Sequence, residues 1–174
     1  PSCQSPSLDA TFNESGFDVL DLLGVTPGLS DSLSESANDV ALNASTGDIV
    51  VVGRQATRQI SVYDNDTAVV VYKSNGDLNT DFDSDGMKSF EFVNGIWSVA
   101  NAVAIQSNDK IVVGGSSVLF VGSSEGLVGQ TYWALARLNT DGTFDTTFDA
   151  DGHRQDFFAT YDNNGRDAAI EDIA

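Results

Sequence analysis

The sequence has little cysteine and few positive charges. Its 174 residues include a single cysteine, Cys3, which excludes an internal disulfide and leaves a free thiol, an intermolecular link or a lipid-attachment remnant open. Eight Lys and Arg residues stand against 26 Asp and Glu residues, a formal net charge of −18. Nucleic acids and anionic membranes bind proteins through Lys and Arg. The composition therefore disfavours both, and favours a positive partner, a divalent cation or simple solubility.

Long apolar runs and histidines are equally scarce. No apolar run approaches the roughly 20 residues that span a bilayer, so no membrane span is expected. The one histidine, His153, would have to serve any Ser-His-Asp or Cys-His arrangement, and no nucleophile elbow accompanies it. We therefore expect His153 to be an exposed turn residue and the protein not to be an enzyme. Abundant Asn, Asp, Ser, Thr and Gly with few Lys residues is typical of an exported bacterial surface protein.

Three sequence elements recur in the same order. The first contains a Phe followed four residues later by a Gly, at Phe12, Phe82 and Phe148, which lie 70 and then 66 residues apart. The second is an Ala-Asn-x-Val-Ala stretch followed by an Ile-Val-Val run, and the third is an Ala-rich apolar run that ends at Asn-Gly or Asp-Gly. The second and third elements lie at 37–53 and 68–76, and again at 100–114 and 134–142.

Each element predicts a short strand, because the runs are β-branched and Asn-Gly or Asp-Gly favours a tight hairpin turn. About four strands per repeat is the anatomy of a propeller blade, and neighbouring sheets must stack to create a core. The sequence thus predicts one all-β domain, 1–174, of tandem four-stranded antiparallel sheets of β-propeller-blade type. Two complete units, about 8–77 and 78–143, precede a partial third unit, 144–174. Phe12, Phe82 and Phe148 are expected to be equivalent and buried.

The repeat resembles a known family. The order Ala-x-Ala-Val-Ala-Ile-Gln, Asp-Lys-Ile-Val-Val-Gly-Gly and Ala-Leu-Ala-Arg-Leu-Asn-x-Asp-Gly is similar to the delta-60 repeat, a propeller-type repeat of large exported bacterial proteins. The match is close at 102–115 and 134–152 and looser at 40–86. The resemblance implies a β-propeller-like fold, export and no established catalytic role. The family has no agreed catalytic residues, so none is transferred to this chain.

One motif indicates a metal. Asp81, Asp83 and Asp85 followed by Gly86 match the first half of a calcium loop, in which three alternate carboxylates converge on a hard cation. The second half departs from the pattern, because the twelfth position is Phe92. Two interpretations stay open: a weak calcium site, or acids that only form the turn after Phe82. No other cofactor is expected.

The function that these observations predict is non-catalytic. We expect a secreted or cell-surface structural or interaction protein, either a homo-oligomeric fibre subunit that assembles head to tail or a segment of a cell-surface adhesin. Its partners would be further copies of itself, or a cell-surface glycan or protein. A calcium-dependent, lectin-like carbohydrate-binding module is the alternative. Residues 171–174 resemble 38–41, so the third unit has only its first two strands, and we expect another copy or a longer chain to complete it.

Overall fold

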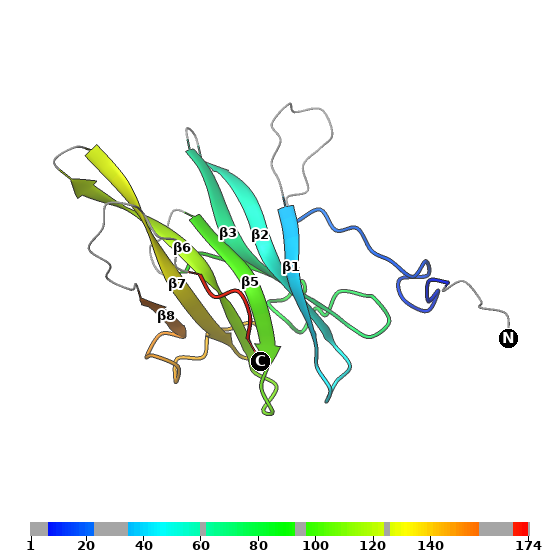
Figure 1. The fold of residues 1–174 in the computed structure, drawn as a ribbon. Helices are drawn as coiled ribbons and strands as arrows, with labels where there is room; N and C mark the ends of the chain where they lie inside the picture. The colour runs from blue at the N-terminus through cyan, green and yellow to red at the C-terminus, as the bar shows by residue number, and fades with distance from the viewer. Residues whose placement is uncertain are drawn as a thin grey trace, which may run out of the picture.

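The computed structural model describes residues 7–22, 35–59, 62–92, 97–123, 126–156 and 169–173, so Cys3 and Ala174 lie outside it. The described residues form eight strands: β1 (Glu35–Leu42), β2 (Ile49–Gln59), β3 (Val62–Tyr72), β4 (Met87–Phe90), β5 (Trp97–Ile105), β6 (Ile111–Ser123), β7 (Gly126–Leu138) and β8 (His153–Asp156). They contain no helix, and thus none with the length and apolar character that crossing a bilayer requires. The predicted all-β fold is confirmed. Hydrogen bonds link the eight strands into one sheet that does not close on itself (Figure 1).

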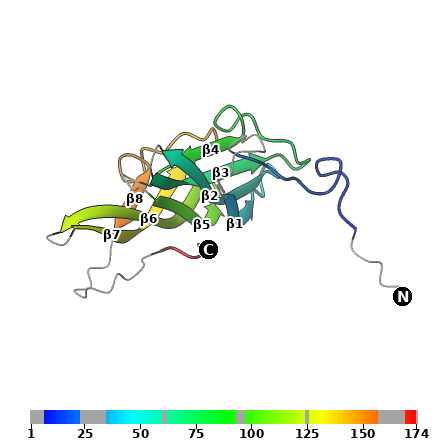
Figure 2. The same cartoon turned by 90° about the horizontal axis from the view of Figure 1, so that it is seen from above.

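The sheet consists of two antiparallel meanders of four strands each. Unit 1 runs β1-β2-β3-β4 and unit 2 runs β5-β6-β7-β8. One parallel residue pair, Asn65 with Trp97, joins them, and β5 packs across β1, β2 and β3. Seen from above, β1 to β4 are grouped together and β6 to β8 lie beside them (Figure 2). The two predicted four-stranded sheets of propeller-blade type are therefore present.

The hydrophobic core lies between the two units. Alternate residues of a strand point to the same face, and alternate residues at the start of β2, the end of β3, the start of β6 and the end of β7 form one buried cluster. The aromatic rings of Phe82 and Phe92, both 0% exposed, lie in the same core. The strand residues that form it are Val50, Val52, Val69, Val71, Ala100, Val103, Ile111, Val113, Ala134, Ala136 and Leu138. The intervening residues Ile49 and Val51 lie outside this cluster and line the opposite face of unit 1.

A β-bulge in the first strand of each unit connects that unit to a later segment of the chain. The register shifts at Asn38 in β1 and at Asn101 in β5. The Asn38 Nδ2 donates to the carbonyl of Ala100 at 2.7 Å, and the Asn101 Nδ2 donates to the carbonyl of Ile170 at 3.2 Å. Ala100 belongs to the first strand of unit 2. Residues 169–173 therefore lie against unit 2 as β5 lies against unit 1.

The fourth strand of each unit comes from the next sequence repeat. β4 belongs to the repeat that begins at residue 78, yet it pairs with β3 of the repeat before, and β8 pairs with β7 in the same way. The prediction of a strand around each Phe was wrong, because the chain turns there and the strand starts only at residue 87 or 153. We call these turns, residues 8–16, 78–86 and 144–152, the Phe loops. Each one ends in a Gly of positive φ whose N–H donates to the carbonyl of the Phe.

Burial differs among the three Phe loops. Phe82 is fully buried, as predicted, but Phe12 and Phe148 are only half-buried, so the prediction of equal burial was wrong for these two. The reason is their place in the array: Phe82 lies between two units, whereas the other two lie at its ends. Phe12 packs against Tyr72 with the ring centres 6.3 Å apart, and the Arg137 guanidinium lies 5.0 Å from the centre of the Phe148 ring.

Candidate functional site

The three acids of the predicted calcium loop lie in the second Phe loop and are exposed. The Asp83 carboxylate pairs with the Lys88 ammonium at 3.3 Å, and the Asp85 Oδ1 accepts a hydrogen bond from the Met87 N–H at 2.9 Å. No three His, Cys, Asp or Glu side chains gather into a metal-holding group anywhere in the described ranges. In this structure Asp83 and Asp85 stabilise the turn, and calcium binding by Asp81, Asp83 and Asp85 stays a prediction.

Asp81 instead lines an acidic pocket between the turns of the two units. The pocket has a volume of about 240 Å³, and its acidic residues are Asp48, Asp81, Asp109 and Asp141. Hydrogen bonds from Thr143 hold the pKa of the Asp141 carboxyl below its ordinary value, so this acid is charged at neutral pH. Sequence reasoning missed this grouping. Its signal was that all four acids occupy turn positions of adjacent repeats.

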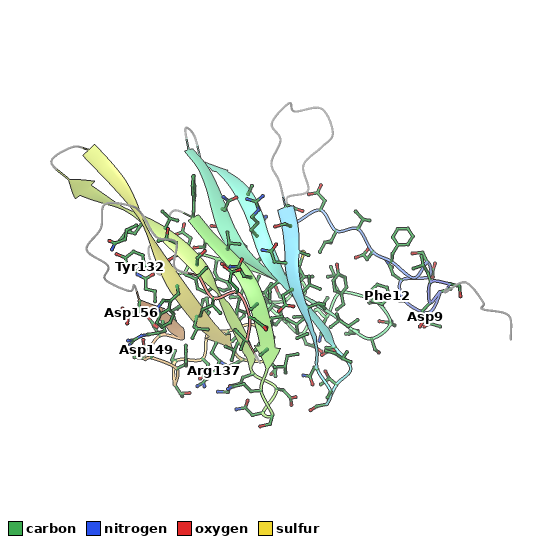
Figure 3. The ribbon with its side chains drawn as sticks, viewed as in Figure 1. Asp9, Phe12, Tyr132, Arg137, Asp149 and Asp156 are labelled. Carbon is green, nitrogen blue, oxygen red and sulfur yellow. The ribbon has the colours of Figure 1, made fainter. Side chains whose placement is uncertain are left out.

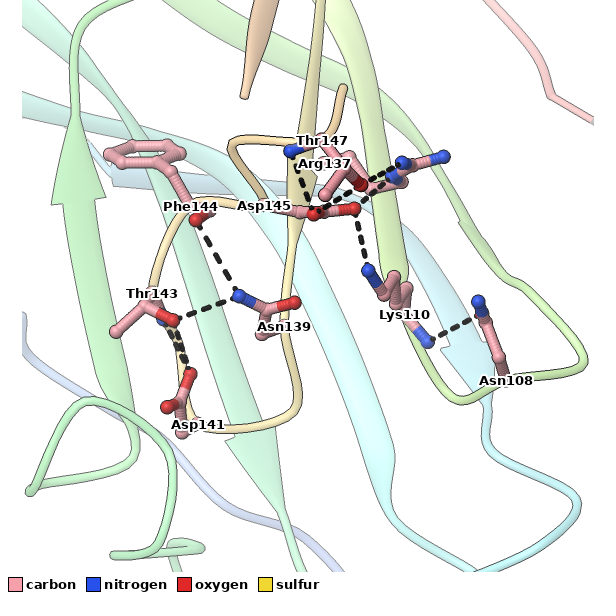
Figure 4. Close-up of polar contacts among 9 residues, drawn as sticks. All are labelled: Asn108, Lys110, Arg137, Asn139, Asp141, Thr143, Phe144, Asp145 and Thr147. Atoms are coloured by element: carbon pink, nitrogen blue, oxygen red, sulfur yellow. Dashed lines mark hydrogen bonds and ion pairs between the residues drawn. The ribbon is translucent and has the colours of Figure 1, made fainter. Parts of the chain in front are cut away.

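Asp145 is the centre of a polar cluster in the third Phe loop, shown in Figure 4. Its side chain is 4% exposed, and its Oδ2 lies 2.7 Å from the Lys110 Nζ and 2.6 Å from the Arg137 Nε. Its Oδ1 accepts hydrogen bonds from the Thr147 N–H at 3.1 Å and from the Thr147 hydroxyl at 2.8 Å. The hydrogen bond from Lys110, followed by that from Thr147, holds the pKa of Asp145 far below its ordinary value. The cluster fixes the third Phe loop to the ends of β6 and β7.

Unit 1 has a counterpart of this cluster that contains no cation. Asp48 stands at the position of Lys110, and Asn79 stands at the position of Asp145. The Asn79 Nδ2 donates to the Asp48 Oδ2 at 3.1 Å. The same register position thus carries an ion-pair cluster in unit 2 and an amide–carboxylate hydrogen bond in unit 1.

His153 is not the exposed turn residue that the sequence predicted. It begins β8 with its side chain 14% exposed, and its ring lies 4.0 Å from the ring of Phe144 and 6.0 Å from that of Phe90, centre to centre. Burial lowers the pKa of the imidazole, and the nearby Asp151 carboxylate opposes this shift in part. The prediction failed because β8 places His153 against aromatic rings at the interface between the units. The local sequence does not show this packing.

The outer face of unit 1 is apolar and open in part, because Val70 of β3 is 6% exposed whereas Val40 of β1 is 60% exposed. With the first Phe loop and residues up to Leu22, it encloses a cavity of about 390 Å³ lined by Ile49, Val51 and Val70. Unit 2 carries the matching face, and there unit 1 buries it: Ile111 is 4% exposed and Val113 is 0% exposed. Ile49 and Val51 are only half-buried. The largest contrast is on the first strands of the units.

Val40 of β1 is 60% exposed, whereas its repeat counterpart Val103 of β5 is 5% exposed. The face that unit 2 buries against unit 1 is therefore the face that unit 1 leaves open. The second element of both copies is apolar at the same positions of the repeat.

Comparisons with known proteins agree with this architecture over part of the chain. No curated protein and no solved structure matches the sequence. Residues 106–148, which run from the end of β5 through the third Phe, match a family described as "Domain of unknown function (DUF5122) beta-propeller". Together with the two four-stranded units, this match supports a propeller-type repeat.

Proposed function

We propose that the protein is a non-catalytic, extracellular structural and interaction module that acts by stacking four-stranded units on one another. The observation that carries the proposal is the open face of unit 1. Val40 on this face is 60% exposed, while the equivalent Val103 is 5% exposed because a neighbouring unit covers it. Covering apolar surface is the main favourable contribution to protein association. The face therefore favours a further unit as its partner.

Two forms of this module fit the observations. In the first, the covering unit belongs to a second copy, and repetition of that contact builds a head-to-tail fibre, since a heterologous contact stays open unless its rotation closes a ring. In the second, the covering unit is another repeat of a cell-surface adhesin. The formal charge of −18 supports a location outside the cell, where an acidic surface keeps an exported protein soluble.

Sedimentation velocity and negative-stain microscopy, from low to high micromolar protein, test the first form. We expect the sedimentation coefficient to rise with concentration and short rods to appear. Val40→Asp should prevent this association, because a charge would be buried on the covered face. Ala44→Asp, in the exposed turn after β1, is the matched control and should assemble normally. A protein that stays monomeric throughout would exclude the fibre.

The acidic pocket favours a second candidate function, a calcium-dependent carbohydrate-binding module. Asp48, Asp81, Asp109 and Asp141 line a pocket of about 240 Å³ between the units, and a calcium ion, which prefers oxygen ligands, would have to draw together carboxylates that form no metal-holding group in this structure. A glycan array with and without a chelator tests this alternative. Chelator-sensitive binding would favour it over the structural role.

A further inference from the structure

The first Phe loop has the geometry of the other two but lacks their strand partner. Its φ angles are 45° at Asn13 and 57° at Glu14, close to 47° and 71° at Asp83 and Ser84. Its Gly16 N–H donates to the Phe12 carbonyl at 2.7 Å, as in the other Phe loops. The loop is therefore already folded as an outer-strand turn.

The two other Phe loops dock on the third strand of a unit through two backbone hydrogen bonds. In unit 1, Val71 donates to the carbonyl of Gly86 and accepts from the N–H of Asn79. In unit 2, Arg137 bonds to Gly152 and Asp145 in the same way. The matching groups of the first Phe loop, the Asp9 N–H and the Gly16 carbonyl, have no such partner among the residues that the structure places.

The segment after this loop also lacks a strand partner. Residues 17–20 correspond to β4 and β8, yet they pair with no strand in the described part of the chain. Two of their apolar side chains face solvent, since Phe17 is 55% exposed and Val19 is 85% exposed. An exposed segment whose backbone pairs with no strand is a template for pairing with another chain.

The charge of Asp9 indicates which strand the first Phe loop can dock on. The Asp9 carboxylate accepts hydrogen bonds from Thr11, as Asp145 does from Thr147, and these bonds hold its pKa below the ordinary value. Asp145 is neutralised by Lys110 and Arg137, whereas no Lys or Arg among the described residues contacts Asp9.

Unit 1 does not supply this cation pair, because the positions of Lys110 and Arg137 hold Asp48 and Val71 there. The complementary docking strand for the first Phe loop is thus β7, with Lys110 at the adjacent start of β6. Figure 3 shows Asp9 and Phe12 at one end of the molecule and Arg137 toward the other. The β7 in question is therefore that of a second copy.

We propose that residues 8–20 of one copy exchange with residues 144–156 of a second copy and pair with its β7. This proposal rests on the head-to-tail form of the function proposed above. In the exchanged register Asp9 takes the place of Asp145 between Lys110 and Arg137, and Val19 takes the place of Gln155 opposite Ala134. β1 of the incoming copy then lies where residues 169–173 lie now.

In the exchange, each residue of 8–20 takes over the contacts of the residue of 144–156 that it replaces. The exchange also buries one additional interface. Unit 2 of the second copy covers the open face of unit 1, around Ile49, Val51 and Val40. The incoming strand is also the more apolar one, with Phe17 and Val19 in place of His153 and Gln155. Burial of that strand and of the open face supplies the driving force for the exchange.

Disulfide trapping of the full chain, with Cys3→Ser to remove the native thiol, tests the register. Val19→Cys with Ala134→Cys should form a ladder of covalent multimers on oxidation. Ala134→Cys with Gln155→Cys is the matched control, because these two residues pair within one copy, and it should form cross-linked monomer. Val19→Cys alone should give no covalent product larger than a dimer, because each copy then has a single cysteine.

A charge change tests the ion-pair exchange independently. Asp9→Lys places like charges beside Lys110 and Arg137, and it should raise the concentration needed for half-assembly by about tenfold or more. Glu14→Lys makes the same change of charge in the exposed turn of the same loop and should have little effect.

The two proposals fail in different ways. Concentration-dependent particles without a Val19–Ala134 ladder would overturn the exchange and leave the structural function standing. Monomers by sedimentation, with no ladder, would overturn both. A ladder together with a selective Asp9→Lys defect supports the exchange.

Discussion

Replacing Phe82 with alanine measures the core between the two units. Its ring is 0% exposed and lies beside Val50 and Val71 of unit 1 and Ile111 of unit 2. Strands from both units enclose the site, so it has little freedom to collapse around a smaller side chain. Truncating a buried Phe to Ala costs about 3–5 kcal/mol. We expect a loss in the free energy of unfolding within this range for Phe82→Ala.

Phe148→Ala is the matched control, since it removes the same group at the same position of the repeat. Phe148 is half-buried and has the Arg137 guanidinium against its ring, so we expect a loss of about 1–2 kcal/mol. Urea melts followed by tryptophan fluorescence give both values, and an unchanged m-value would show that the unfolded state is the same. Equal losses for the two variants, or a loss below about 1 kcal/mol for Phe82→Ala, would refute the inter-unit core.

Three further predictions concern His153, Gly115 and the calcium motif. Burial lowers the pKa of His153, so the folded protein resists its protonation. The contribution of His153 to stability should be full above about pH 6.5 and should fall as the pH drops below that value, and His153→Phe should flatten this step in melts at pH 7 and pH 5. Gly115→Ala would place a Cβ in steric conflict with the Val99 carbonyl oxygen at the β-bulge, so the backbone must shift and denaturant melts should show a loss of about 1–3 kcal/mol or more. If calcium binds at Asp81, Asp83 and Asp85, millimolar calcium should raise the melting temperature and Asp81→Asn should reduce the rise, whereas calorimetry without heat would leave the acids as turn formers.

The repeat and its β-branched runs were enough to predict an all-β fold with two four-stranded units, because strand propensity and hairpin turns are local properties. The stagger of the fourth strand could not be predicted in this way. Residues 87–90 have no local feature that assigns them to β3 of the preceding repeat, since that pairing depends on how the units stack. The error about Phe12 and Phe148 has the same origin, because equivalent sequence positions differ in burial when one of them lies at the end of an array.

The candidate site, like the fold, could be predicted from the sequence only in part. The Asp-x-Asp-x-Asp-Gly motif suggested three converging carboxylates, but the backbone of the Phe loop directs Asp83 to Lys88 and Asp85 to the Met87 N–H. Asp81 joins acids from three other turns, a grouping that only the tertiary fold creates. The Asp145 cluster could have been predicted from the sequence. Lys110 and Arg137 are basic, whereas the other repeat has an acidic and an apolar residue at these positions.

The borrowed fourth strand has a consequence for how the protein melts. When the repeat that contains β4 unfolds, unit 1 loses the strand that pairs with β3. The core side chains of unit 1 then also lose their contact with the Phe82 ring. Neither repeat can thus open without weakening its neighbour, and the coupling between nearest neighbours is large compared with the stability of a single repeat. The two units should therefore unfold in one cooperative transition, and a cut between residues 77 and 78 should separate two pieces that are each incomplete.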